Sequence, residues 1–138
     1  MPQREYHITD IKEIEGHASE LVGQANLHGY SEGVQFALRL VIEEALTNAL
    51  RHGHRDLPDN TPVRFTWSVD ETSIQLDVED KGPGFNPDDL PDPTLDENLE
   101  KPSGRGVMLM RAYMTEVKYN ETGNQVTMTY TKSASISD

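Results

Sequence analysis

The sequence predicts an α+β domain, because helical and strand periodicities occupy separate stretches of the chain. Apolar residues recur at helical spacing from about residue 11 to residue 52 and again from 107 to 114. They alternate with polar residues over 63–79 and 116–132, which is typical of antiparallel hairpins with one face toward water. A chain of 138 residues is long enough for one domain with a real core.

The N-terminal stretch predicts a short strand followed by a helix. Residues 3–8 are expected to form an edge strand. Asp10 and Glu13 resemble a capping box, in which each residue satisfies a free backbone N–H at the helix start. The apolar spacing that follows predicts a helix over about 11–27.

A second helix, capped by Ser31 and ending at Gly53, carries the first candidate site. Glu44 and Asn48 are four residues apart, so they share one helix face. They flank the apolar stripe, which consists of Val41, Ile42, Ala45, Leu46 and Ala49. Two interpretations stay open. The pair is the polar boundary of an ordinary helix, or it faces a cleft with Glu44 as a base and Asn48 as an oxygen ligand for Mg²⁺.

Asp80 is the second candidate, because it follows a strand and shares that strand's apolar face. Alternation over 74–79 places Asp80 on the side of the apolar residues rather than the polar ones. A buried carboxylate is costly unless it is hydrogen-bonded. Asp80 therefore either caps backbone in the glycine turn 80–85 or awaits a donor from a ligand.

A long aperiodic segment, 86–103, separates that turn from a third helix over 107–114. It holds six acidic residues and one basic residue. A loop of this length is uncommon in a compact domain unless it is a functional lid or disordered. Gly104 and Gly106 then open the helix, whose first free N–H groups could bind an anion. The alternative is a mobile loop that enters a core helix.

The composition and the absence of several known motifs disfavour a number of function classes. The net charge of −12 argues against a nucleic-acid surface, and no apolar run could span a membrane, so we expect a cytoplasmic protein. The absence of cysteine excludes disulfides and thiolate metal sites, and the five histidines lack zinc spacing. No P-loop pattern occurs, and the 104–106 glycines do not follow a strand, as a dinucleotide fold requires.

Three motifs in order resemble the GHKL superfamily of ATPases and kinases. Residues 44–53 (EALTNALRHG) resemble its N box, 80–85 (DKGPGF) its first glycine box and 104–110 (GRGVMLM) its second. Each motif is weak alone, but their order and spacing are specific, and the resemblance covers about 8–131. It implies a Bergerat-type fold, an α+β two-layer sandwich with three helices on one face of a mixed, mostly antiparallel sheet.

Within the superfamily the chain most resembles the RsbW-like anti-sigma factor serine/threonine kinases of bacteria. A histidine kinase would carry a helical dimerisation segment before this domain, and only about 30 residues precede the second helix here. The resemblance implies a kinase that uses ATP and Mg²⁺, binds a sigma factor and phosphorylates a small antagonist protein. The free sheet face or the first helix would support a homodimer.

The resemblance also implies roles for the motif residues. Glu44 would orient or deprotonate the attacking hydroxyl, and Asn48 would hold the Mg²⁺ that bridges the ATP phosphates. Asp80 would accept a hydrogen bond from the adenine amino group. Gly82 and Gly84 would let the backbone approach the base and sugar.

The second glycine box and the acidic lid would act on the phosphates. Gly104, Arg105 and Gly106 would meet them at the helix N-terminus, with Arg105 as the counter-charge. The lid over 86–103, net −5 (−6 + 1), would stay open until a partner docks and would lower ATP affinity. The tail, 133–138, is expected to be frayed.

Two other functions stay open from the sequence. One is a non-catalytic regulatory module that binds a partner, with ATP structural or absent. The other is a detached histidine-kinase-type catalytic domain that phosphorylates a separate protein. The presence of Glu44 favours a kinase over the non-catalytic module.

Overall fold

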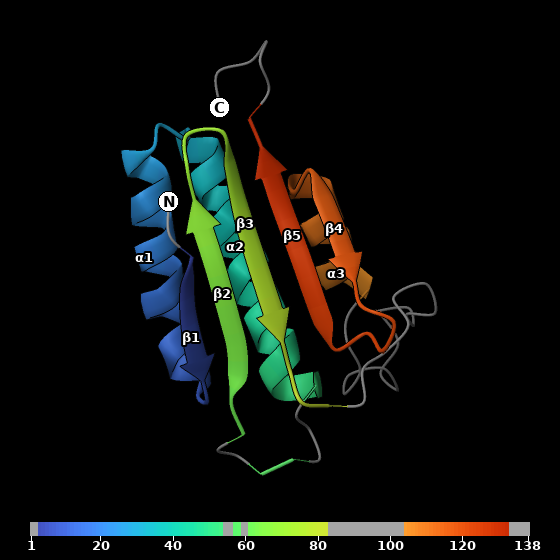
Figure 1. Ribbon diagram of the computed structural model, residues 1–138. Helices are drawn as coiled ribbons and strands as arrows, with labels where there is room; N and C mark the ends of the chain where they lie inside the picture. The colour runs from blue at the N-terminus through green and yellow to red at the C-terminus, as the bar shows by residue number, and fades with distance from the viewer. Residues whose placement is uncertain (1–2, 54–56, 59–60, 83–103, 133–138) are drawn as a thin grey trace.

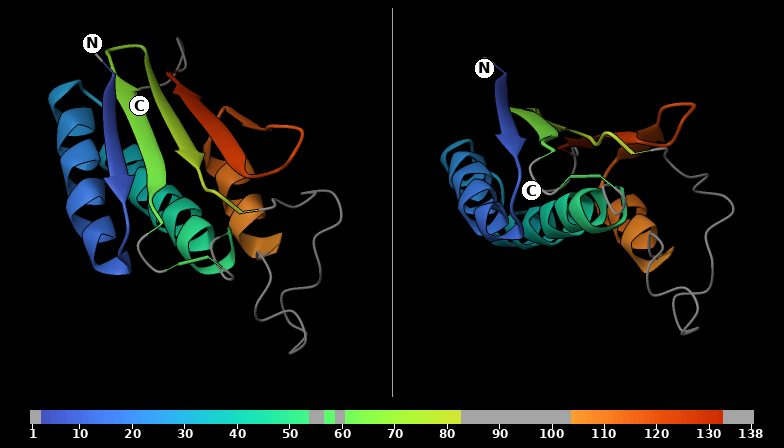
Figure 2. Two further views of the ribbon diagram at one scale, coloured as in Figure 1. Left: turned by 60° about the horizontal axis from the view of Figure 1, so that its bottom comes forward. Right: turned by 90° about the horizontal axis from the view of Figure 1, so that it is seen from below.

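The structure is a computed structural model that describes residues 3–53, 57–58, 61–82 and 104–132. This part of the chain forms two layers, a five-stranded sheet and three α-helices that cover one of its faces (Figures 1 and 2). The predicted two-layer α+β sandwich is therefore confirmed. The expected lid, the residues around Gly84 and the tail lie outside the described residues.

The sheet has the strand order β1-β2-β3-β5-β4, and the four pairings between described strands are all antiparallel. The strands are β1 (Arg4–Ile8), β2 (Val63–Val69), β3 (Ser73–Glu79), β4 (Glu116–Tyr119) and β5 (Gln125–Thr131). The predicted edge strand near the N-terminus and both predicted hairpins are confirmed. The register pairs Glu79 with Gln125, so the residues after β3 lie beside the turn that precedes β5.

The helical layer contains α1 (Ile14–Leu27), α2 (Glu32–Asn48) and α3 (Gly104–Tyr113). A 3-10 turn (Ile11–Glu13) precedes α1, and a π-helical turn (Ala49–Gly53) follows α2. Helix α2 lies between the other two and packs against both. No helix within the described stretches is both long and apolar enough to cross a membrane.

The predicted helix starts are confirmed. The Asp10 carboxylate accepts from the Lys12 N–H at 2.8 Å, and the Glu13 carboxylate accepts from the Asp10 N–H at 3.0 Å, which completes the capping box. Ser31 Oγ accepts from the Val34 N–H at 3.2 Å at the start of α2. Each cap satisfies backbone donors that have no partner inside the helix.

Two helix boundaries differ from the sequence prediction. The α-helical part of α2 ends at Asn48 instead of continuing to Gly53, because the last turn widens into a π-helix that keeps Ala49 buried. Helix α3 begins at Gly104, so the glycines of the third motif lie inside its first turn. Backbone N–H groups of a first turn have no intrahelical partner, so those near the two glycines are open to a ligand without an intervening side chain.

The core lies between the two layers. Its largest fully buried side chains come from both, and they include Phe65, Trp67, Leu46, Ile42, Met110 and Met128. Burial of each side chain of this size contributes about 1.5–3 kcal/mol relative to exposure. This packing holds α2 and α3, which carry two of the motifs, against the sheet whose strand β3 leads into the third.

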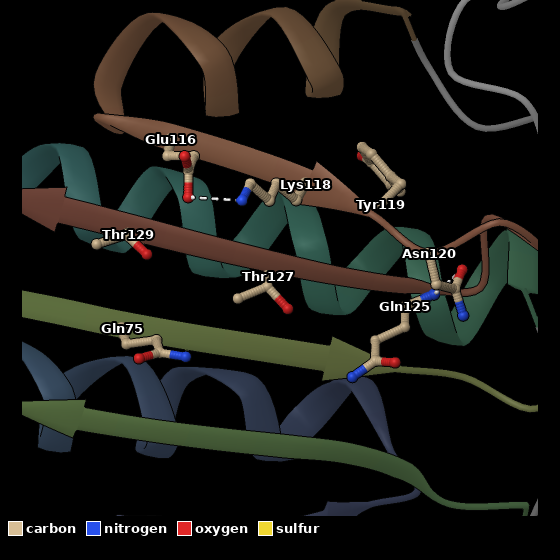
Figure 3. A pocket seen from close by; sticks show the side chains of 8 residues that line it. All are labelled: Gln75, Glu116, Lys118, Tyr119, Asn120, Gln125, Thr127 and Thr129. Carbon is tan, nitrogen blue, oxygen red and sulfur yellow. Dashed lines mark hydrogen bonds and ion pairs between the residues drawn. The ribbon is translucent and has the colours of Figure 1, made fainter.

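The opposite face of the sheet is polar, and no described helix covers it. Asp77 accepts from Gln125 Nε2 at 3.0 Å and from Thr127 Oγ1 at 2.8 Å, which ties β3 to β5 on this side. An open hollow of about 350 Å³ lies here (Figure 3). It is lined by Gln75, Glu116, Lys118, Tyr119, Asn120, Gln125, Thr127 and Thr129. The hollow lies on the sheet face opposite the helices.

Candidate functional site

Asp80 follows the last residue of β3, on the side of the sheet that the helices cover. Its carboxyl group is half-buried, and its Oδ1 accepts from the Gly82 N–H at 2.7 Å. Burial raises the pKa of Asp80 from its ordinary 3.8 to about 6, the hydrogen bond from Gly82 opposes this shift, and the charge of Glu79 adds to it. The local cap is present, yet among the described residues it gives the ionised carboxylate a single hydrogen bond.

The turn between β4 and β5 holds the glycine segment after Asp80. The Asp80 N–H donates to the Asn124 carbonyl at 2.9 Å, and Asn124 Nδ2 donates to the Gly82 carbonyl at 3.1 Å. Asn120 Oδ1 organises this turn, because it accepts from the N–H groups of Gly123, Asn124 and Gln125 at 2.7, 3.1 and 3.3 Å. Asn124 was not among the predicted site residues, since nothing in one sequence pairs this turn with residue 82.

The end of α2 carries Glu44 and Asn48, both half-buried and one turn apart. The neighbouring residues Ala45 and Leu46 are buried against the sheet, which fixes how the helix is rotated. Asn48 is the last α-helical residue before the π-helical turn. Single π-helical turns occur frequently at functional sites, because they change the direction of side chains at a helix end.

Helix α3 begins with Gly104, Arg105 and Gly106 and is held to the core by Val107 and Met110, which are 3% and 1% exposed. Its N-terminus therefore offers backbone N–H groups that lack partners within the helix. Such a helix start favours a negatively charged ligand through these donors and the helix dipole.

The three motifs converge at one end of the fold. The ends of α2 and β3 lie at the lower end of the molecule in Figure 1, and the start of α3 is the lower end of that helix. The left view of Figure 2 shows the three beside one another. Of the predicted site residues, Glu44, Asn48, Asp80, Gly82 and the 104–106 turn belong to this end. Gly84 lies outside the described residues.

The described residues contain no group of three or more His, Asp or Glu side chains that could hold a metal ion alone. At the end of α2, Asn48 would supply one amide oxygen. Mg²⁺ takes few protein ligands and completes its octahedral shell with water and substrate phosphates. The donor set therefore fits a magnesium ion that arrives with a phosphate ligand.

Comparison with known proteins gives the class to which this fold and site belong. Residues 8–130 match the model of the family described as "Histidine kinase-like ATPase domain". This region includes all three motifs. The chain belongs to the histidine kinase-like ATPase domain family.

Individual proteins of similar sequence indicate a smaller group within this family. The serine-protein kinase RsbW of Bacillus subtilis (strain 168) is 33% identical over 118 residues, which cover 79% of this chain and 72% of the relative. RsbW of Oceanobacillus iheyensis is 28% identical over 106 residues, covering 72% and 66%. The anti-sigma F factor of Bacillus cytotoxicus is 34% identical over 84 residues, covering 59% and 56%. The match spans slightly less than two thirds of the second relative and little more than half of the third. These relatives confirm an RsbW-like member of the GHKL superfamily.

Proposed function

We propose that this chain is an ATP-dependent protein serine/threonine kinase that acts as an anti-sigma factor in the bacterial cytoplasm. It binds a sigma factor and phosphorylates a small antagonist protein. The convergence of the three motifs at one end of the fold carries this proposal. The names of the relatives, serine-protein kinase and anti-sigma F factor, support it.

Asp80 and Gly82 are the residues proposed to bind adenine. The half-buried carboxylate has lost part of its hydration, which its raised pKa reflects. A donor from a ligand, such as the amino group of adenine, would restore a hydrogen bond where water is partly excluded. Gly82 is buried next to it and has no side chain that would keep a base away.

The first turn of α3 and Asn48 are proposed to bind the phosphates and their magnesium ion. The N–H groups at residues 104–106 and the charge of Arg105 attract the phosphates. The Asn48 oxygen would be one ligand of a magnesium ion. When bound with the nucleotide, this ion neutralises charge that develops on the phosphates during transfer.

Glu44 is the proposed catalytic residue because it precedes Asn48 by one helical turn. It would hold the serine or threonine hydroxyl of the substrate protein and take its proton. The hydroxyl oxygen then forms a bond to the γ-phosphorus, the bond to the β-γ bridging oxygen breaks, and ADP leaves. Most of the catalysis in such transfers is positioning and charge stabilisation.

The variant Glu44→Gln tests this role, because glutamine keeps the size of the side chain but cannot take a proton. Transfer from radiolabelled ATP would be measured with a panel of small antagonist proteins from bacterial anti-sigma systems. We expect at least a hundredfold loss of transfer with ATP affinity retained. Glu43→Gln is the matched control, because Glu43 is a half-buried neighbour on a different face of α2.

The same assay separates the competing functions. A phosphoprotein stable in acid indicates phosphoserine or phosphothreonine, whereas an acid-labile product would favour the histidine-kinase type. If neither the wild type nor Glu44→Gln transfers phosphate, the result would favour a non-catalytic binding module. Self-association through the open sheet face or α1 stays a prediction for the purified protein.

A further inference from the structure

We infer that Asn124 is a positioning residue for nucleotide recognition: its side-chain amide locks Gly82, and Gly82 in turn orients the Asp80 carboxylate toward the base. This inference rests on the proposed ATP site and names a residue that controls its selectivity for adenine. Asn124 lies in the β4–β5 turn, outside all three motifs.

Three hydrogen bonds close a ring through these residues. The Asp80 N–H donates to the Asn124 carbonyl at 2.9 Å, and Asn124 Nδ2 donates to the Gly82 carbonyl at 3.1 Å. The Gly82 N–H then donates to Asp80 Oδ1 at 2.7 Å. Both backbone polar groups of Gly82 are therefore fixed, which removes the conformational freedom that glycine would otherwise have.

The neighbouring side chain determines which way the Asn124 amide points. Asn120 Oδ1 is occupied by three backbone N–H groups of the turn, so its amide nitrogen is the group left to point at Asn124. Asn120 Nδ2 donates to Asn124 Oδ1 at 2.8 Å. The Asn124 oxygen is thereby used, and its NH₂ group faces the Gly82 carbonyl.

The ring of hydrogen bonds occupies one Asp80 oxygen and fixes the orientation of the other. Because Oδ1 is held by Gly82, the carboxylate cannot rotate freely. No residue in the described part of the chain donates to its second oxygen, which can therefore accept from the ligand. Truncation of Asn124 leaves the backbone bond to Asp80 but releases the Gly82 carbonyl. The carboxylate then samples more orientations, and an amino group of a base gains less from it.

The experiment compares two probes, ATP and purine riboside triphosphate, which lacks the adenine amino group. The ratio of their affinities measures recognition of that group alone. In Asn124→Ala we expect ATP affinity to fall about tenfold while the affinity of the second probe changes little, since loss of one oriented hydrogen bond costs about a factor of ten. A purely structural role would weaken both probes equally and leave the ratio unchanged.

Two further variants sharpen the comparison. Asn124→Asp keeps the shape of the side chain and the acceptor for Asn120 but cannot donate to Gly82. The ratio of its affinities for ATP and purine riboside triphosphate should therefore fall as well. Its added charge affects both triphosphates alike, so it does not change this ratio. Gln125→Ala is the matched control. It removes a side-chain bond between β5 and β3, from Gln125 to Asp77, on the other face of the sheet. Its ratio should equal that of the wild type.

A wild-type ratio in both Asn124 variants would overturn the inference while leaving the ATP site intact. If the wild-type protein binds neither probe, the proposed function fails, and the ring is tested without nucleotide. Carbon-detected NMR titration of the Asp80 carboxyl then provides the readout. The Gly82 N–H lowers the pKa of Asp80, so Asn124→Ala should raise that pKa further. An unchanged titration would overturn the inference.

Discussion

The Gly82 N–H donates a hydrogen bond of 2.7 Å to Asp80 Oδ1. Within the described residues, this is the one hydrogen bond that the half-buried carboxylate accepts. One hydrogen bond does not offset the lost hydration, so the pKa of Asp80 rises to about 6. The folded protein thus keeps an ionised group in an unfavourable position. Such an arrangement is expected of a group that serves a ligand rather than the fold.

The first prediction is that Asp80→Asn stabilises the nucleotide-free protein at neutral pH. The folded state binds the Asp80 proton more tightly than the unfolded chain, so stability falls as pH rises between about 3.8 and about 6. At pH 7.5 the ionised group costs roughly 1–2 kcal/mol, after allowance for water that screens its exposed part. Urea unfolding should show the variant more stable by about this amount.

The stability difference should shrink as the pH approaches 4, because Asp80 of the wild type is then protonated. Asp70→Asn serves as a control of opposite sign. The Asp70 carboxylate accepts from the N–H groups of Thr72 and Ser73, which lower its pKa to about 2, so its neutralisation should destabilise the fold at neutral pH. A destabilised Asp80→Asn at every pH would contradict the account of Asp80.

The second prediction concerns the pH dependence of ATP binding. Only the ionised Asp80 carboxylate has its second oxygen free to accept from adenine, so ATP affinity should be constant above pH 7 and fall below pH 6. Calorimetric titration should give a dissociation constant about tenfold higher at pH 5 than at pH 7. Purine riboside triphosphate controls for titration of the phosphates. Equal pH dependence of both ligands would show that Asp80 does not read the base.

Local chemistry made much of the fold predictable. The capping box of Asp10 and Glu13 and the Ser31 cap depend on a few neighbouring residues, so helix starts could be predicted from sequence. Alternation in β2 and β3 is equally local, and it placed Asp80 on the covered face. The positions of Glu44 and Asn48 followed from helical spacing alone.

Two features could not be predicted from the sequence, one because it is too short to leave a pattern and one because it depends on distant contacts. The π-helical turn after Asn48 leaves no periodic trace, because it spans a single turn. The role of the β4–β5 turn depends on the β3–β5 register, which brings Asn124 to Gly82 across 42 positions of sequence. A single sequence contains nothing that pairs Asn120 or Asn124 with the first glycine box.

The most direct test of the account is calorimetric titration of magnesium–ATP into the wild-type protein and into Asp80→Asn. We predict saturable binding that requires magnesium in the wild type and its loss in the variant, with circular dichroism showing that both proteins are folded. Absence of binding in both folded proteins, or equal binding in both, would contradict the assignment of Asp80 and its glycine segment as the adenine site.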